Sequence, residues 1–252
     1  MRYRTVEFGP NISAAKREGR EMQKLLEERH LIRPGSGIDG GVFVSHCETR
    51  AAQEVITLDF DDSPEIKRLY GEIKRRVERQ TGAMREHGME VTQTDRERFT
   101  AAAVFSAVYA ELDQYEMELN DERVRNLEKA DAFRHLHAFE MPLETVVREH
   151  TGVCRHGALL SALLIERFQK ERYVAGTVDV ITAESESLVG GETQYGGMHT
   201  WCAYTCSDKK TIVVDVRNGL LRDMEKINAQ DAGWEYSVTL DPRQEVTTVM
   251  RL

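Results

Sequence analysis

Cysteines and long apolar runs are both scarce in this chain. Its 252 residues include four cysteines, at positions 47, 154, 202 and 206, which is too few for a disulfide framework. If residues 202–206 form one strand, Cys202 and Cys206 lie about 13 Å apart, too far to bridge. The chain has no uncharged apolar stretch of about 18 residues and no cleavable signal at its start. We therefore expect reduced thiols, no membrane span and a cytoplasmic location, although export without a cleavable signal leaves the same sequence.

Basic residues are in the minority. The sequence has 34 Lys and Arg against 43 Asp and Glu, a formal charge of −9, and it contains no basic block. This balance argues against nucleic acid or an anionic membrane as the main partner. With 40% hydrophobic residues, the chain has the composition of a globular protein, and it is long enough to build a core without a metal or a disulfide.

The histidines do not form a metal-binding pattern. His46 and Cys47 are a lone neighbouring pair, and His135 and His137 have no partners at zinc-ligand spacing. The other histidines outside the candidate site show no such spacing either: His30, His87 and His150. We therefore expect neither a metal nor a cofactor.

The first 140 residues carry helical patterns and little chemistry. Apolar residues at helical spacing predict four helices. They span residues 13–32, 63–82, 95–119 and 120–142. Two short apolar runs, 42–44 and 55–58, predict strands.

Local signals mark the starts of these helices. Ser63 followed by Pro64 predicts an N-cap and a first helical position, and Thr94 with Glu97 has the spacing of a capping box. Asn120 is a candidate cap for the fourth helix.

We divide the chain into two parts. Residues 1–92 form a mostly helical N-terminal region that we expect to select the substrate or partner, and residues 93–252 form the catalytic core. Residues 95–150 lead into Cys154 through short breaks at Asn120, Pro142 and Gly152, which predicts that these helices pack against the core as one folding unit. Residues 1–92 either belong to the same unit or form a separate lobe, with the glycine-rich stretch 35–41 as a flexible link.

Residues 152–165 place a cysteine at the start of an almost wholly apolar helix. Such a helix is buried on all sides, whereas Cys154 borders Gly152 and two polar residues and should reach a surface cleft. Free backbone N–H groups and the positive end of the helix dipole favour a thiolate there. The alternative is a buried, inert cysteine, which is the usual fate of this residue.

A strand at 197–205 and its hairpin partner at 211–216 carry a histidine and an acid. Asp215 lies within Ile-Val-Val-Asp-Val, where a carboxylate without a partner is unfavourable, and His199 is the natural partner. The two share a face only if the hairpin loop has an odd number of residues. A five-residue loop, 206–210, pairs Thr205 with Thr211 and places Asp215 diagonally next to His199.

Together, Cys154, His199 and Asp215 supply a nucleophile, a base and a carboxylate that orients the base. His156 is nearer to Cys154 in sequence, but on a helix it points about 200° away. We interpret it as a helix-surface or supporting group. The glycine-rich segment 184–197, just before His199, is either a mobile lid over the cleft or a plain hairpin connection.

These blocks resemble the transglutaminase-like superfamily of papain-type thiol enzymes. Its members show a Gly-x-Cys-Arg block on a Leu-rich helix, a His-x-Trp strand and an Asp strand, in the order found here over residues 145–220. The resemblance implies an α+β fold in which the helix carrying the cysteine packs on an antiparallel sheet. It also implies that Cys154 is the nucleophile, His199 the base and Asp215 its orienter.

One part of the expected site has no candidate. Both tryptophans follow Cys154 in the chain, so the side-chain donor of the oxyanion hole is unassigned. The backbone N–H of Cys154 should supply one donor.

The sequence thus predicts a thiol acyl-transfer enzyme that acts on glutamine carboxamides or peptide bonds of a protein or peptide substrate. Water as the acceptor makes it a deamidase or a cysteine protease, and an amine makes it a transglutaminase. An arylamine N-acetyltransferase also uses Cys, His and Asp in this order and has a similar Asp-Val strand, but its Gly-Gly-Tyr-Cys block is absent. A non-catalytic binding scaffold with a retained fold is the other alternative, and the oligomeric state is open.

Overall fold

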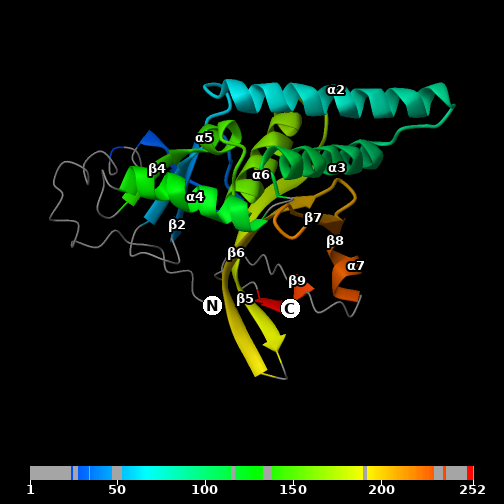
Figure 1. Ribbon diagram of the computed structural model, residues 1–252. Coiled ribbons are helices and arrows are strands. Elements are labelled where there is room, and N and C mark those ends of the chain that lie inside the picture. Colours follow the sequence, from blue (N-terminus) through cyan, green and yellow to red (C-terminus); the bar gives the residue numbers. More distant parts are fainter. Residues whose placement is uncertain are drawn as a thin grey trace.

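The computed structural model describes residues 24, 28–33, 35–46, 53–114, 117–132, 138–189, 192–229, 235–236 and 249–251. These residues form two β-sheets and several helices, so the expected α+β class is confirmed (Figure 1). Cys47, His135, His137 and most of the predicted helix 13–32 lie outside the described residues.

A four-stranded sheet gathers strands from both ends of the first 142 residues. Its order is β1 (His30–Leu31), β2 (Gly41–His46), β3 (Gln53–Thr57) and β4 (Ala138–Pro142). The strands β2 and β3 are antiparallel and the two outer pairs are parallel. The two predicted short strands are therefore confirmed, and the described N-terminal region is less helical than expected.

Several of the predicted helix bounds are wrong. The helix predicted over 95–119 ends at Glu111, and the next helix begins at Met117 and not at residue 120. His30–Leu31 is a strand, and the helix expected to reach Pro142 ends at Ala132, after which β4 pairs with β3. The reason is tertiary: in β4, Met141 is buried and Glu140 is exposed, so pairing with the buried strand β3 satisfies an alternating pattern that no local helix signal opposes.

Five of the described helices precede the second sheet in the chain: α2 (Pro64–Glu86), α3 (Gln93–Glu111), α4 (Met117–Ala132), α5 (Leu143–Arg148) and α6 (Cys154–Lys170). The start of α2 is as predicted, although the Ser63 side chain makes no capping bond. The capping box of α3 is formed by Thr92 and Asp95 and not by Thr94 and Glu97. Glu97 is fully buried instead, because the backbone N–H groups of Ala175 and Ser207 donate to it.

The second sheet carries the strands of the candidate site. Its order is β8 (Leu220–Asp223), β7 (Thr211–Asp215), β6 (Glu192–Thr205), β5 (Thr177–Val189), β10 (Val249–Arg251) and β9 (Glu235–Tyr236). All neighbours are antiparallel except β5 and β10. A last short helix, α7 (Met224–Ala229), follows β8. Within the predicted segment 184–197, the described residues 184–189 and 192–197 pair as the outer part of β5 and β6, seen at the bottom of Figure 1. They are therefore strands of a hairpin.

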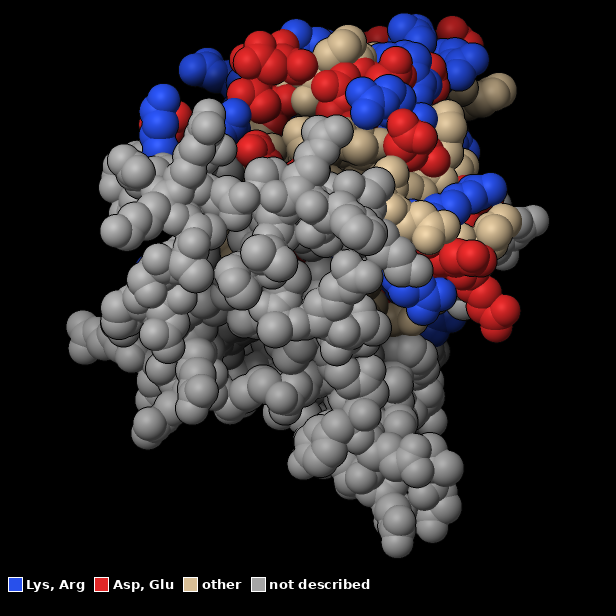
Figure 2. Space-filling model, turned by 60° about the vertical axis from the view of Figure 1, so that its left-hand side comes forward, with Lys and Arg blue, Asp and Glu red and all other residues tan. Residues whose placement is uncertain are grey.

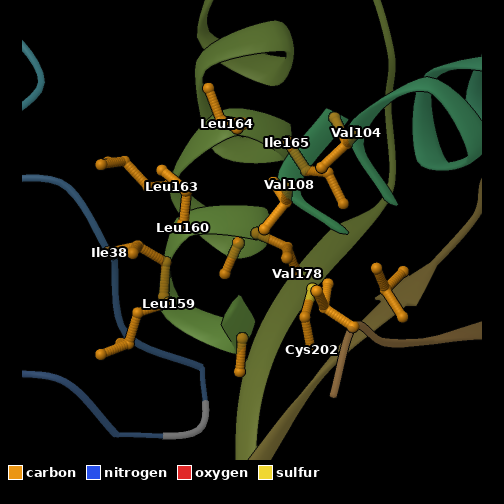
Figure 3. Packing of buried hydrophobic residues seen from close by; sticks show 14 of the residues in the cluster. Ile38, Val104, Val108, Leu159, Leu160, Leu163, Leu164, Ile165, Val178 and Cys202 are labelled. Carbon is orange, nitrogen blue, oxygen red and sulfur yellow. The ribbon is translucent and has the colours of Figure 1, made fainter. Parts of the chain in front are cut away.

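The apolar helix α6 lies in the centre of the molecule, as its composition predicts. It contacts β5, β6 and β7 on one side and α3 and α5 on others, and every residue from His156 to Ile165 is buried. In Figure 3, Leu159 and Leu163 point toward the loop that carries Ile38, while Ile165 points toward α3. A helix surrounded in this way holds its first residue in a fixed place.

One cluster of buried residues extends across the proposed boundary at residue 92. It includes Ile56 of β3, Ile66 and Ile73 of α2, and Val104 of α3, together with the alanine, leucine, isoleucine and phenylalanine residues of α6. The boundary itself falls between α2 and α3, which lie side by side (Figure 1). The division into a selecting region and a core stays a prediction.

Positive and negative side chains are interspersed on the described surface seen at the top of Figure 2. On α2, for example, Arg68 pairs with Glu65 at 2.8 Å, with Glu72 at 2.9 Å and with Glu111 of α3 at 2.6 Å. This part of the surface therefore presents no field of a single sign. None of the described helices is both long and apolar enough to cross a bilayer.

Candidate active site

Cys154 is the first residue of α6 and its side chain is half-buried. Gly152 allows the chain to approach closely there, since a Cβ would meet the side chains of Leu112, Val146 and His156 at 3.0–3.1 Å. Gly157, one turn into the helix, would likewise meet Val216 at 3.1 Å. Gly157 thus lets the start of α6 lie against Val216, which directly follows Asp215, and Gly152 lets the preceding loop lie against Leu112 and Val146.

A buried polar cluster holds the loop before Cys154. The Asn120 side chain accepts from the Gly152 N–H at 2.7 Å and donates to the Leu112 carbonyl at 2.7 Å. Gln114 donates to the Gly152 carbonyl at 2.8 Å. Asn120 therefore lies inside α4 and anchors the loop of the nucleophile, so its predicted role as a helix cap is wrong.

His199 and Asp215 lie together as the hairpin register predicts. The loop spans residues 206–210, and Thr205 pairs with Thr211. The His199 Nε2 atom is 2.7 Å from Asp215 Oδ2, with 8% of His199 and 1% of Asp215 exposed. Because the odd loop length sets this register, the prediction that both side chains share a face is confirmed.

The imidazole of His199 also contacts the nucleophile. Cys154 lies close enough to His199 for each side chain to shift the pKa of the other, and the backbone N–H of Thr200 also lowers the pKa of the thiol. Since Nε2 faces Asp215, Nδ1 is the ring nitrogen left for Cys154. The indole of Trp201 stacks with this imidazole, with ring centroids 6.0 Å apart and an angle of 20° between the ring planes.

The electrostatics of this group favour an ion pair. Burial lowers the pKa of His199, but hydrogen bonds and charge interactions with Asp215 and Cys154 outweigh it and raise this pKa to about 10. Burial raises the pKa of the Cys154 thiol, whereas His199, Arg155 and the Thr200 N–H lower it by more, so the net shift is downward. Between these two pKa values, the site holds a thiolate next to an imidazolium.

The other described cysteines have the opposite environment. Both are buried and free, and burial raises the pKa of the Cys206 thiol to about 12 and that of Cys202 further. Cys154 is thus distinguished from them by its neighbours and not by its residue type.

Asn218 belongs to the site and was missed by the sequence reasoning. Its backbone N–H donates to Asp215 Oδ1 at 3.2 Å, and its side-chain amide donates to Asp215 Oδ2 at 2.8 Å. With His199, three donors converge on one buried carboxylate, which stabilises its charged form. An Asn three residues after a strand-ending Asp and before Gly219 is a turn signal that could have identified it.

His156 has a supporting position. It is fully buried, its Nδ1 accepts from the Val153 N–H at 3.1 Å, and its Nε2 lies 3.0 Å from a carboxylate oxygen of Glu54. The prediction that it points away from the reaction is confirmed by these partners, while a place on the helix surface is wrong. Glu54 was not anticipated from the sequence.

Metal binding finds no support in the described residues, among which no three His, Cys, Asp or Glu side chains gather to hold an ion. The side chain of His46, like Cys47, His135 and His137, lies outside the part that the structure describes. The arrangement of Cys154, His199 and Asp215 is suited to nucleophilic attack by sulfur with proton transfer through an imidazole.

Comparison with known proteins does not extend this description. No protein-family model, no curated protein and no solved structure matches the chain. What the site does must therefore be argued from its own geometry.

Proposed function

We propose that this protein is a thiol acyl-transfer enzyme of the transglutaminase-like kind. The observation that carries the proposal is the arrangement of three side chains at the start of α6. The Cys154 thiol lies beside His199, and His199 Nε2 is 2.7 Å from Asp215 Oδ2. The packing of α6 on the antiparallel strands β5, β6 and β7 agrees with the papain-type core that the sequence resemblance implies.

The proposed substrate is a glutamine carboxamide or a peptide bond. The Cys154 thiolate attacks the carbonyl carbon, and the developing oxyanion accepts a hydrogen bond from the Cys154 N–H. This N–H has no acceptor within the helix, because it belongs to the first turn. The imidazolium of His199 gives its Nδ1 proton to the departing nitrogen as the C–N bond breaks. A thioester and ammonia, or an amine, result.

The second half of the reaction restores the enzyme. His199, now neutral, accepts a proton from water or from an acceptor amine as that nucleophile attacks the thioester. The C–S bond breaks, and the product is an acid or a new amide. Asp215 keeps the imidazole oriented and stabilises its charged form through both steps.

Alkylation of the thiol tests the nucleophile directly. The rate of modification of Cys154 by iodoacetamide, followed by peptide mapping against pH, should rise through an inflection below pH 8. Cys202 and Cys206 serve as internal controls and should stay unmodified in the folded protein. An inflection at the usual thiol value, or equal labelling of all three residues, would refute an activated cysteine and favour the binding scaffold.

The reaction class needs a second assay. Ammonia release from a glutamine-containing peptide, with and without an added primary amine, separates deamidation from cross-linking, and cleavage of the same peptide reports proteolysis. The Cys154→Ser variant should abolish all three. If the wild-type protein instead transfers an acetyl group from a thioester donor to an arylamine and releases no ammonia, the arylamine N-acetyltransferase alternative replaces this proposal.

A further inference from the structure

Glu54 is a carboxylate with no exposed surface, and it comes from a strand about a hundred residues before the nucleophile. A buried glutamate requires partners, since an unpaired charge in the interior is strongly unfavourable. Its two oxygens have separate partners: Oε2 accepts from Arg155 Nε, and Oε1 lies 3.0 Å from His156 Nε2. Both partners directly follow Cys154 in the chain.

The contact with His156 fixes the first turn of α6. The Nδ1 atom of that ring accepts the Val153 N–H at 3.1 Å, so the ring proton sits on Nε2 and faces Glu54. The carboxylate therefore orients the ring, and the ring in turn satisfies a backbone donor at the start of the helix. The first-turn N–H of Cys154 is held in the same rigid segment.

The contact with Arg155 fixes a charge beside the nucleophile. The guanidinium is largely buried, with 14% of its side chain exposed, and its charge lowers the pKa of the Cys154 thiol. Without its carboxylate partner, an arginine at this depth has a reason to turn toward water.

We propose that Glu54 is a positioning residue of the active site, holding the two residues after Cys154 so that the thiol and the Cys154 N–H face the substrate in one geometry. It acts through Arg155 and His156 and touches no reacting atom. The proposal rests on the proposed function of Cys154, and it makes the N-terminal sheet a structural part of the catalytic site.

The test compares Glu54→Gln with Glu97→Gln. Both residues are fully buried glutamates, but Glu97 accepts from Ala175 and Ser207, far from α6's first turn in sequence. Each variant is measured well below its melting temperature, with folded sites counted by titration of Cys154. If a glutamate is only structural, replacing it should lower the stability of the protein and leave the reactivity of Cys154 unchanged.

In Glu54→Gln we expect the inflection of iodoacetamide alkylation to rise by about one pH unit, because Arg155 is released from the thiol's surroundings. We also expect kcat per titrated site to fall about ten- to a hundredfold at unchanged KM, since the nucleophile is misplaced while the substrate surface is intact. Glu97→Gln should show neither change.

Three results would overturn the proposal. An unchanged inflection means that Glu54 is only structural, and a lower inflection means that it merely offsets the charge of Arg155. An equal shift in Glu97→Gln means that any buried substitution has this effect. If Glu54→Gln yields no folded protein, Arg155→Lys decides, because it keeps the charge and removes the Nε contact: a raised inflection supports the proposal and an unchanged one overturns it.

Alkylation needs no substrate, so the two proposals fail separately. A wild-type protein with an inflection below pH 8 but no ammonia release would refute the proposed substrate, and the effect of Glu54 on the thiol would still be measured. A wild-type thiol with an ordinary inflection would refute the proposed function first.

Discussion

Replacing Asp215 by Asn removes a charge from the site and leaves its shape nearly unchanged. Three donors converge on the carboxylate, two of them on Oδ2: His199 Nε2 at 2.7 Å and the Asn218 amide at 2.8 Å. An asparagine that turns its oxygen toward these two donors keeps both bonds. Its amide nitrogen then faces the Asn218 N–H, which contributes the longest bond, at 3.2 Å. We therefore expect Asp215→Asn to fold and to keep the orientation of His199.

The loss should appear in the charged form of the histidine. Two opposite charges about 4 Å apart attract by about 4 kcal/mol at an effective dielectric constant near 20, and each 1.4 kcal/mol changes a rate or an equilibrium about tenfold. Both groups are over nine-tenths buried, so solvent screens little of this attraction. The variant should lose a factor of about 10² to 10³ in kcat/KM, because the imidazolium that protonates the leaving group is destabilised by up to that amount.

Two measurements check this expectation. The first is kcat/KM for ammonia release from a glutamine peptide, and the second is the alkylation profile of Cys154, whose inflection should move up toward that of a free thiol. Asp208→Asn is the matched control, since Asp208 is an exposed residue of the same hairpin whose side chain accepts a hydrogen bond from a loop N–H, that of Lys210. A kcat/KM for Asp215→Asn within threefold of the wild type would remove Asp215 from the mechanism.

Three further predictions follow from the same contacts. Asn218→Ala removes one donor to Asp215 and should lower kcat about three- to tenfold at unchanged KM; an unchanged kcat in steady-state assays would contradict this. Burial raises the pKa of Glu54, but His156 and Arg155 outweigh this effect and lower the pKa from an ordinary 4.5 to about 2. The stabilising effect of the charged Glu54 is therefore present above pH 4.5 and is lost as the pH falls toward 2. Acid unfolding followed by circular dichroism should therefore be steeper in the wild type than in Glu54→Gln, and parallel curves would count against it. A chain that begins at Glu90 lacks β3 and α2, exposes the apolar face of α6 and should aggregate; a monomeric, fully active product in size-exclusion chromatography would show that the first 89 residues are dispensable.

The parts of the site that the sequence predicts are those set by short-range rules. The face shared by His199 and Asp215 follows from the parity of one hairpin loop, and the place of Cys154 follows from an apolar helix that begins after Gly152. Each of these inferences uses fewer than about twenty consecutive residues. The confirmed start of α2 at Pro64 is of the same kind.

The errors arise where distant segments meet. Asn120 has the side chain of a helix cap, yet it binds the loop at Gly152, because the approach of α4 to that loop offers it a buried partner. Residues 138–142 form a strand because β3 is available to pair with them. Glu97 has the spacing of a capping box with Thr94, but its carboxylate is buried and accepts a hydrogen bond from Ser207 in the β6–β7 loop. No local pattern contains these partners.

Arg155 and His156 show how such a partner can be inferred in part from the sequence. Two polar residues at the head of a helix that is otherwise buried on every side must themselves become buried, and a buried arginine requires an acid. The fully buried Glu54 on a short apolar strand is that acid. The sequence therefore implies that a carboxylate must exist, while the fold decides which one it is. In this protein the acid is Glu54, which lies in the N-terminal region. Through Arg155 and His156, it links this region, for which no motif predicts a role, to Cys154, which the motifs identify.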